Sequence, residues 1–170
     1  MAPPRPESPE LSRAVGQGLV AGQFLLLLAL AVAAPLDRPP APALAARMGA
    51  VACALYGAWT GLGGVIQLGR HLTPLPLPKA DGQLQTAGIY ARLRHPLYAS
   101  TVAIALGWTL WWQSPWSAGL TLALAGWLHL KVRFEEVCLR RQFPGYAAYA
   151  RRVPRYFPKF RQPPAPASEP

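Results

Sequence analysis

The stretch PLYASTVAIALGWTLWWQSPWSAGLTLALAGWLHL, residues 96–130, decides the fold class, because it contains no Asp, Glu, Lys or Arg and only His129 titrates near neutral pH. As one helix it would be about 52 Å long at 1.5 Å per residue, too long for a single crossing of a hydrocarbon layer about 30 Å thick. The apolar pattern breaks at Gln113, Ser114 and Pro115, where a polar pair that suits a turn precedes a residue that resists a helix interior. The stretch therefore predicts two short membrane spans, 97–112 and 116–132, joined in a tight hairpin.

Two other stretches lack charge for long enough to cross a membrane, residues 14–36 and 48–69. Only 14% of the residues are charged and 52% are apolar, whereas a soluble domain carries about 25% charged residues. The long apolar runs exclude a disordered chain, and the two distant cysteines, Cys53 and Cys138, exclude a disulfide scaffold. We expect an all-α, polytopic membrane protein with about four transmembrane helices, a closing helical hairpin and a cytoplasmic C-terminal helical segment.

The positive charge is placed unevenly. Seventeen basic and seven acidic residues give a net charge of +10, and the basic residues gather after the second span and after the fourth. The hairpin turn carries none, and the turn between the first two spans carries only Arg38 and Arg47. The positive-inside rule therefore predicts cytoplasmic termini and a cytoplasmic 70–95 connection. The Ala-, Pro- and Arg-rich composition favours a bacterial inner membrane, and nucleic-acid binding is disfavoured because no binding motif accompanies the basic residues.

The first apolar stretch has a second interpretation, a cleaved signal peptide, since Arg13 precedes a Leu-rich core and small residues. The long leading segment, with Glu7 and Glu10, favours a retained span. We accordingly divide the chain into a disordered N-terminal tail (1–13), two transmembrane helices (14–69), a region that holds the reactive side chains (80–160) and a disordered Pro-rich tail (162–170).

Two polar segments hold nearly all the reactive groups, LQTAGIYARLRHPLY (84–98) and KVRFEEVCLRRQFPGYAAYARRVPRYFP (131–158). Both adjoin the hairpin on the same predicted side of the membrane, so we expect them to face each other. In the first segment Gly88 permits a turn and Pro96 begins the third span. The residues before Pro96 are either an ordinary interfacial cap or part of an anion site at the helix N-terminus.

In the second segment Lys131 and Glu135 share one helical face at i, i+4 spacing and can pair. Two interpretations stay open for the adjacent carboxylates Glu135 and Glu136: a solvated helix face, or Glu135 pointing into a cavity where it binds a cationic group. Tyr146 and Tyr149 are expected to form an aromatic surface beyond this helix.

Taken together, the pattern L-x-x-x-G-I-Y-x-x-x-R-H-P-x-Y, the charge-free hairpin, and E-E-x-x-L-x-x-x-F-x-x-Y-x-x-Y-x-x-x-V-P-R-x-x-P resemble the isoprenylcysteine carboxyl methyltransferase family. Its members are integral membrane methyltransferases that use S-adenosylmethionine, and the phospholipid N-methyltransferases look similar. The match covers about residues 80 to 160. Sterol-reductase-like membrane enzymes, which use NADPH, share R-H-P-x-Y but differ where this chain has Leu97 and Ala99–Ser100; a non-enzymatic membrane scaffold is the third alternative.

The resemblance implies S-adenosylmethionine as the cofactor and a carboxylate, thiol or amine of a hydrophobic or lipid-like molecule as the methyl acceptor, with membrane lipids as neighbours. It implies catalytic roles for His95 and Glu135 and a substrate contact for Lys131, and no metal site. Methyl transfer needs alignment and desolvation more than a strong acid or base, so Cys138 as a covalent relay is only a minor alternative. The implied cofactor-binding residues are Gln83, Leu84, Gln85, Tyr90, His95, Pro96, Leu97, Tyr98 and Glu135.

Overall fold

The computed structural model describes residues 9–36, 41–77 and 82–158, and this part of the chain is helical without strands. The predicted all-α class is thus confirmed for the described residues, while residues 1–8 and 162–170 of the predicted tails lie outside them. The elements are α1 (Pro9–Leu36), α2 (Leu44–Leu68), η1 (Gly69–His71), η2 (Gly88–Ala91), α3 (Pro96–Trp112), α4 (Pro115–Gln142) and α5 (Tyr146–Arg152).

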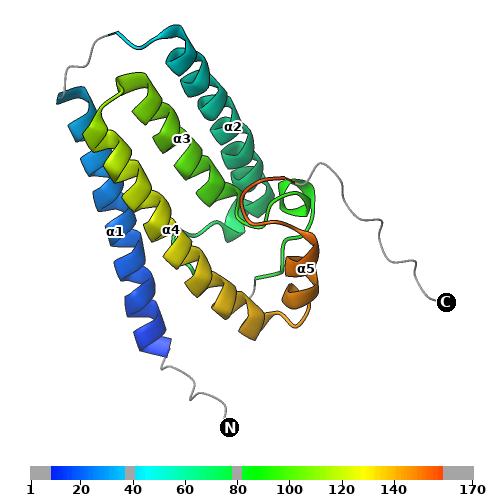
Figure 1. The fold of residues 1–170 in the computed structure, drawn as a ribbon. Coiled ribbons are helices and arrows are strands. Elements are labelled where there is room, and N and C mark those ends of the chain that lie inside the picture. The colour runs from blue at the N-terminus through cyan, green and yellow to red at the C-terminus, as the bar shows by residue number, and fades with distance from the viewer. Residues whose placement is uncertain (1–8, 37–40, 78–81, 159–170) are drawn as a thin grey trace.

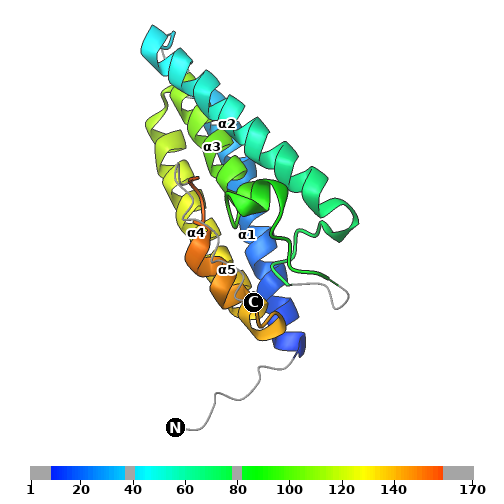
Figure 2. The same ribbon diagram turned by 90° about the vertical axis from the view of Figure 1, so that its right-hand side faces the viewer.

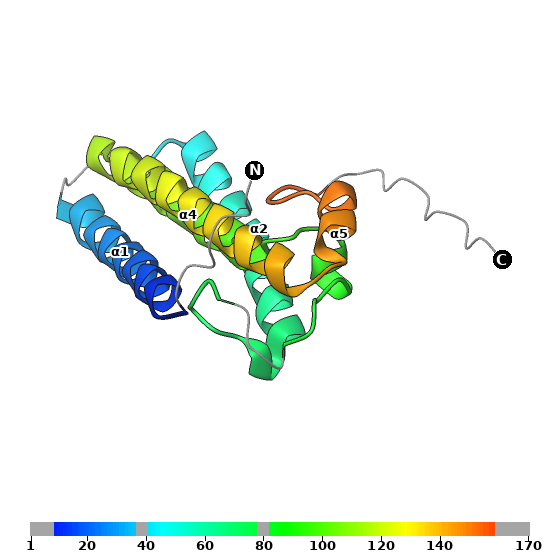
Figure 3. The same ribbon diagram turned by 90° about the horizontal axis from the view of Figure 1, so that it is seen from below.

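Four long helices form a bundle in which α1 lies along α4, α2 lies along α3, and α3 turns back onto α4 (Figure 1). The side view shows α2 and α3 running together over their length (Figure 2). The α3–α4 turn is at one end of the bundle. The start of α1, the end of α2, the α2–α3 connection and α5 gather at the other end (Figure 3), which is where the reactive segments meet.

The predicted break in the long apolar stretch is confirmed. Helix α3 ends at Trp112, and its C-cap Gln113 adopts the left-handed conformation with φ 49°. The Ser114 side chain then caps α4 by accepting a hydrogen bond from the Ser117 amide, and Pro115 occupies the first turn, where its missing N–H costs nothing. The turn therefore rests on local interactions that the sequence encodes.

One boundary differs from expectation. Helix α1 begins at Pro9, so residues 9–13, which we expected in the disordered tail, are helical. Proline suits the first helical position, and the first-turn carboxylate of Glu10 is favourable beside the helix dipole. The expected continuation of the last helix beyond the apolar stretch is confirmed, since α4 runs as one helix from Pro115 to Gln142.

Helices α1, over Glu10–Leu36, and α2, over Leu44–Leu68, are long and apolar enough to cross a membrane. Their outward faces carry large apolar side chains such as Leu25, Leu28, Leu55 and Ile66, which are 62–78% exposed in the isolated chain. Such continuous apolar surface is unfavourable in water and favourable against lipid chains. Helix α3, with 17 residues, and the charge-bearing α4 do not meet the same criterion, so the count of four spans stays a prediction.

Close packing of α2 on α3 positions the start of α3. Gly57, Gly61 and Gly64 lie at i, i+4, i+7 spacing on the face of α2 that meets α3, and the Ser100 hydroxyl donates a hydrogen bond to the Gly57 carbonyl at 2.7 Å. A methyl group on Gly61 would lie 2.6 Å from the Ser100 Oγ atom. Small residues in this pattern allow membrane helices to approach closely.

Candidate functional site

The two polar segments predicted to face each other do so, joined by hydrogen bonds between main chains. The amides of Arg94 and His95 donate to the carbonyls of Pro154 and Arg155 at 2.9 and 3.1 Å. The buried hydroxyl of Tyr149 donates to the Tyr90 carbonyl at 2.7 Å. These hydrogen bonds connect the residues before α3 to the segment after α5.

Local backbone geometry presents the first segment to the site. Gly88 has φ +58°, and a Cβ atom there would lie 2.5 Å from the side-chain oxygen of Gln67, so only glycine suits the turn into η2. That turn buries Tyr90. His95 then occupies the N-cap position of α3, its carbonyl accepts the Ala99 amide at 3.0 Å, and Pro96 takes the first turn as predicted.

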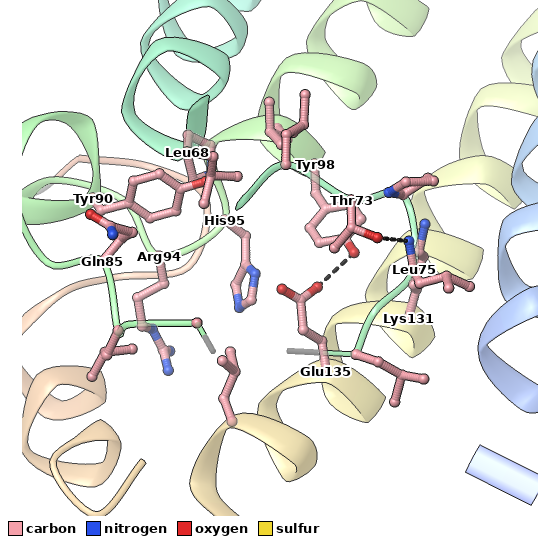
Figure 4. A pocket seen from close by; sticks show the side chains of 18 of the residues that line it. Leu68, Thr73, Leu75, Gln85, Tyr90, Arg94, His95, Tyr98, Lys131 and Glu135 are labelled. Carbon is pink, nitrogen blue, oxygen red and sulfur yellow. Dashed lines mark hydrogen bonds between the residues drawn. The ribbon is translucent and has the colours of Figure 1, made fainter. Parts of the chain in front are cut away.

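A cavity of about 360 Å³ opens between this segment, α1, residues 72–77 and 82–85 of the α2–α3 connection, and the second half of α4 with α5 (Figure 4). The imidazole of His95 lies between Arg94 on one side and Glu135 on the other (Figure 4). The cavity wall brings together every predicted site residue, namely Gln83, Leu84, Gln85, Tyr90, His95, Pro96, Leu97, Tyr98, Lys131 and Glu135. The individual roles given to these residues stay predictions.

Glu135 lies at the cavity wall, as one of the two interpretations expected. The Tyr98 hydroxyl donates a hydrogen bond to its Oε2 atom at 2.6 Å (Figure 4), a short contact typical of an ionised acceptor. The ring of Tyr98 is held in turn by His95, at 5.7 Å between ring centroids. The carboxylate and the phenol therefore form one positioned unit.

Lys131 does not pair with Glu135 as we expected. Its ammonium group is buried and donates to the side-chain oxygen of Gln23 at 2.7 Å, and it lies 5.4 Å from the centre of the Tyr98 ring. Helix α1 covers this side of α4 and presents Gln23 to the ammonium group, while Tyr98 donates to Glu135. Gln23 therefore lines the cavity as well, and the only sequence signal for it was a polar residue within an apolar span.

Glu136, for which no functional role was predicted, is a buried carboxylate that contacts several cationic side chains of the site. It is 1% exposed, and its carboxylate lies 3.0 Å from Arg94 Nη1, 2.8 Å from Arg155 Nη2, 3.3 Å from Arg140 Nη2 and 3.2 Å from His95 Nε2. Burial disfavours its ionisation, but the hydrogen bonds from His95 and Arg155 and the charge of Arg94 outweigh burial and hold the pKa of Glu136 well below its usual range. A buried carboxylate with these partners stays ionised.

The tyrosines after α4 are part of the interior rather than an aromatic surface. Tyr146 and Tyr149 are 1% and 4% exposed and pack with Val153 against Leu84 and other apolar side chains. Burial, followed by the charge of Glu136, raises the pKa of Tyr146 to about 12, so its hydroxyl is a protonated donor at neutral pH. Burial likewise raises the pKa of Tyr90.

A second cavity of about 450 Å³ lies on the other side of Tyr98, between α2, α3 and α4. Its walls are almost entirely apolar, with Tyr156 and Phe157 beside them; His129, also in this wall, lies 3.2 Å from the Tyr156 hydroxyl through its Nδ1 atom. Tyr98 is the residue that lines both cavities, whereas Cys138 lines neither. The two spaces are therefore neighbours that share Tyr98.

Comparison with known proteins agrees with this geometry. The model of the phospholipid methyltransferase family matches residues 45–145. The chain belongs to the phospholipid methyltransferase family. The matched region runs from the start of α2 to the loop after α4, so it includes most residues of the first cavity but not Gln23, Tyr146 and Tyr149. No solved structure matches the chain.

This family member also resembles two curated bacterial proteins. It is 37% identical over 82 residues to the cobalt-zinc-cadmium resistance protein CzcN of Cupriavidus metallidurans, covering 48% of this chain and 38% of that protein. It is 37% identical over 78 residues to the nickel-cobalt-cadmium resistance protein NccN of Alcaligenes xylosoxydans xylosoxydans, covering 45% and 37%. The aligned regions span less than two fifths of these relatives. Within residues 9–36, 41–77 and 82–158, no group of three or more His, Cys, Asp or Glu side chains is placed to hold a metal ion.

Proposed function

We propose that this phospholipid methyltransferase family member transfers a methyl group from S-adenosylmethionine to a carboxylate, thiol or amine of a hydrophobic or lipid-like acceptor. One observation carries the proposal: a single cavity brings Tyr90 of the G-I-Y motif and the R-H-P-x-Y residues together with the first glutamate of the E-E pair. Its volume of about 360 Å³ is in the range of sites for small molecules and cofactors, about 300–1,000 Å³.

The residues of this cavity suit such a cofactor. Glu135 offers a carboxylate for the cationic amino group, and the rings of Tyr90 and Tyr98 offer faces for an aromatic base or a sulfonium cation. When bound, S-adenosylmethionine supplies an electrophilic methyl group on sulfur. The protein's part is positioning and exclusion of water: Glu135 and His95 hold the Tyr98 ring, and the buried Lys131 lies against it.

The second cavity supports a hydrophobic acceptor. Its walls would bind hydrocarbon and offer few partners to a polar molecule. Because Tyr98 lines both cavities, an acceptor in the second one would have its reactive end near the ring that borders the cofactor site. The acceptor would enter from the bilayer, while the polar cofactor enters from the aqueous end of the bundle.

We further propose that all four long helices span a bacterial inner membrane, with both termini cytoplasmic. Helices α3 and α4 pack on the two helices that are long and apolar enough to cross, and the end with the reactive segments is the basic end. A cysteine placed at Gln113, in a variant without Cys53 and Cys138, should react with an impermeant maleimide added from the periplasm. A cysteine at Arg141 should react only after the membrane is opened, and the reverse pattern would refute the orientation.

The test of the reaction class is calorimetry on the detergent-purified protein, with S-adenosylhomocysteine and NADPH titrated separately. We expect micromolar binding of the first and none of the second. Glu135→Gln should weaken binding at least tenfold without changing the melting temperature, and Glu10→Gln, an exposed first-turn substitution, should leave binding unchanged. Binding of NADPH alone would favour a reductase, and binding of neither ligand would favour a scaffold.

A further inference from the structure

Two buried hydrogen-bond donors at the first cavity have no partner within the described part of the chain. They are the Nε–H of Arg94 and the hydroxyl of Tyr146. The side chain of Arg94 is 10% exposed and Tyr146 is 1% exposed, and both residues line the cavity. Because buried donors without partners are costly, a native structure that keeps two of them at one wall requires an explanation, such as a ligand.

The two donors lie close to each other at the same cavity. The Arg94 guanidinium acts on the Tyr146 hydroxyl through its charge and through a side-chain interaction, both of which work against the rise in the pKa of Tyr146, so the groups are close neighbours. The Arg94 Nε–H and the Tyr146 hydroxyl hydrogen still have no acceptor within the described part of the chain. Arg94 is anchored through Nη1, which lies 3.0 Å from Glu136, and this leaves its Nε–H available. Tyr146 is anchored by its ring, which packs on Tyr149 and lies 5.8 Å from the Arg140 guanidinium carbon.

The excess of positive charge around Arg94 favours binding of an anion. Glu136 is the carboxylate that contacts the guanidinium groups of Arg94, Arg140 and Arg155, so three positive charges surround one negative charge in this cluster. The other carboxylate at the cavity, Glu135, is engaged by Tyr98 on the far side of His95 (Figure 4). The cavity is therefore positive at the Arg94 end, whereas at the other end the Glu135 carboxylate and the buried Lys131 ammonium group offset each other.

We propose that Arg94 Nε–H and the Tyr146 hydroxyl form a carboxylate subsite, which takes the amino-acid carboxylate of the cofactor. This inference rests on the proposed function and adds to it a binding residue, Tyr146, and an orientation of the ligand along the cavity. A carboxylate matches the subsite because its two oxygens accept from a guanidinium edge and a phenol at once, and charge-assisted hydrogen bonds of this kind are strong.

Tyr146→Phe tests the subsite, since it removes a hydroxyl that donates no hydrogen bond within the described part of the chain. The readout is calorimetric binding of two probes, S-adenosylhomocysteine and its decarboxylated analogue, which keeps the amino group and lacks only the carboxylate. The wild type should bind the first probe at least tenfold more tightly. In Tyr146→Phe this preference should fall to a few-fold, because affinity for the first probe drops about tenfold while affinity for the analogue stays the same.

Tyr149→Phe is the matched control. It removes a neighbouring phenol whose hydrogen bond goes to the Tyr90 carbonyl, so it should lower the melting temperature and leave the preference between the probes unchanged. Equal affinity of the wild type for both probes, or an equal loss for both in Tyr146→Phe, would overturn the subsite while the proposed function stands. Failure of the wild type to bind either probe would overturn the proposed function itself.

Discussion

At the scale of single residues, the two adjacent glutamates at the start of the E-E-x-x-L motif have different environments and different partners. Glu135 faces the cavity and accepts from Tyr98, whereas Glu136 is buried among Arg94, Arg155 and His95. Successive residues of an α-helix project about 100° apart. The two carboxylates therefore point in different directions, which reduces the repulsion between them. The first is available to a ligand, and the second holds the segments together.

This division of work predicts different outcomes for the same substitution at neighbouring positions. Glu136→Gln removes the countercharge of buried guanidinium groups and should destabilise the protein by about 3 kcal/mol, as loss of one partner of a buried ion pair does. Glu135→Gln should leave stability nearly unchanged and weaken ligand binding at least tenfold. Thermal unfolding in detergent and calorimetry on both variants check this; interchange of the two phenotypes would contradict it.

The low pKa of Glu136 gives a second prediction, on pH. Its folded-state pKa is held below the ordinary Glu value of about 4.3, so the unfolded chain takes up the proton first and the stabilisation increases with pH. The contribution should be complete above about pH 5 and should decline as the pH falls through about 4.3. The difference in melting temperature between wild type and Glu136→Gln should therefore shrink from pH 7 to pH 3; a constant difference would refute the assignment.

At the scale of the elements, the contact between α2 and α3 controls where the site residues stand. Gly64 lets Leu97 approach, Gly61 lets Ser100 approach, and Gly57 accepts the Ser100 hydrogen bond. Leu97 and Tyr98 both line the cavity, so the separation of these two helices is transmitted directly to the cavity wall. The stripe of small residues is therefore a requirement of the site as well as of the fold.

Gly61→Leu should force α2 away from α3, because even a Cβ atom would lie 2.6 Å from Ser100 Oγ. Overpacking of this kind costs about 1–3 kcal/mol, and we expect weaker binding of S-adenosylhomocysteine together with a lower melting temperature. Gly126→Leu, at an exposed position of α4 with nothing within 4 Å of its Cβ position, is the control. If Gly61→Leu behaves like the control, the close approach does not shape the site.

At the scale of the whole molecule, α1 completes the site from outside the family-matched region 45–145. The indole N–H groups of Trp127 and Trp108 donate to the carbonyls of Leu19 and Leu30 in α1 at 2.9 and 3.3 Å. Gln23 of α1 accepts from Lys131 at the cavity. Cleavage of the first helix as a signal peptide would therefore leave the buried ammonium group without this acceptor.

Gln23→Ala should therefore lower affinity for S-adenosylhomocysteine several-fold and reduce stability by about 1–3 kcal/mol, the usual cost of leaving a buried polar group unsatisfied. Gln17→Ala, at an exposed position of the same helix, should change neither quantity. An epitope tag at the N-terminus should stay on the purified protein. Loss of the tag with ligand binding intact would show that α1 is not part of the site.

Much of the site could be predicted because its residues stand in short, ordered patterns. Gly88 at a turn, Pro96 at a helix start and Ser114–Pro115 at a hairpin act through their immediate neighbours, so the sequence alone indicates them. Lys131 and Glu136 were misjudged for the opposite reason. Their partners, Gln23 and Arg155, come from α1 and from the segment after α5, and no pattern within α4 shows which side each helix covers.

The sequence by itself determined the helical class and the hairpin turn, since charge-free length and local turn and capping preferences do not depend on the rest of the chain. The resemblance of its motifs to the isoprenylcysteine carboxyl methyltransferase family indicated the predicted site residues that line the cavity. Only the tertiary structure decided which carboxylate faces the ligand, which one binds the arginines, and that α1 contributes to the wall. Those outcomes depend on how helices pack side by side, and hydrogen bonds between segments about 100 residues apart are determined by that packing rather than by sequence spacing.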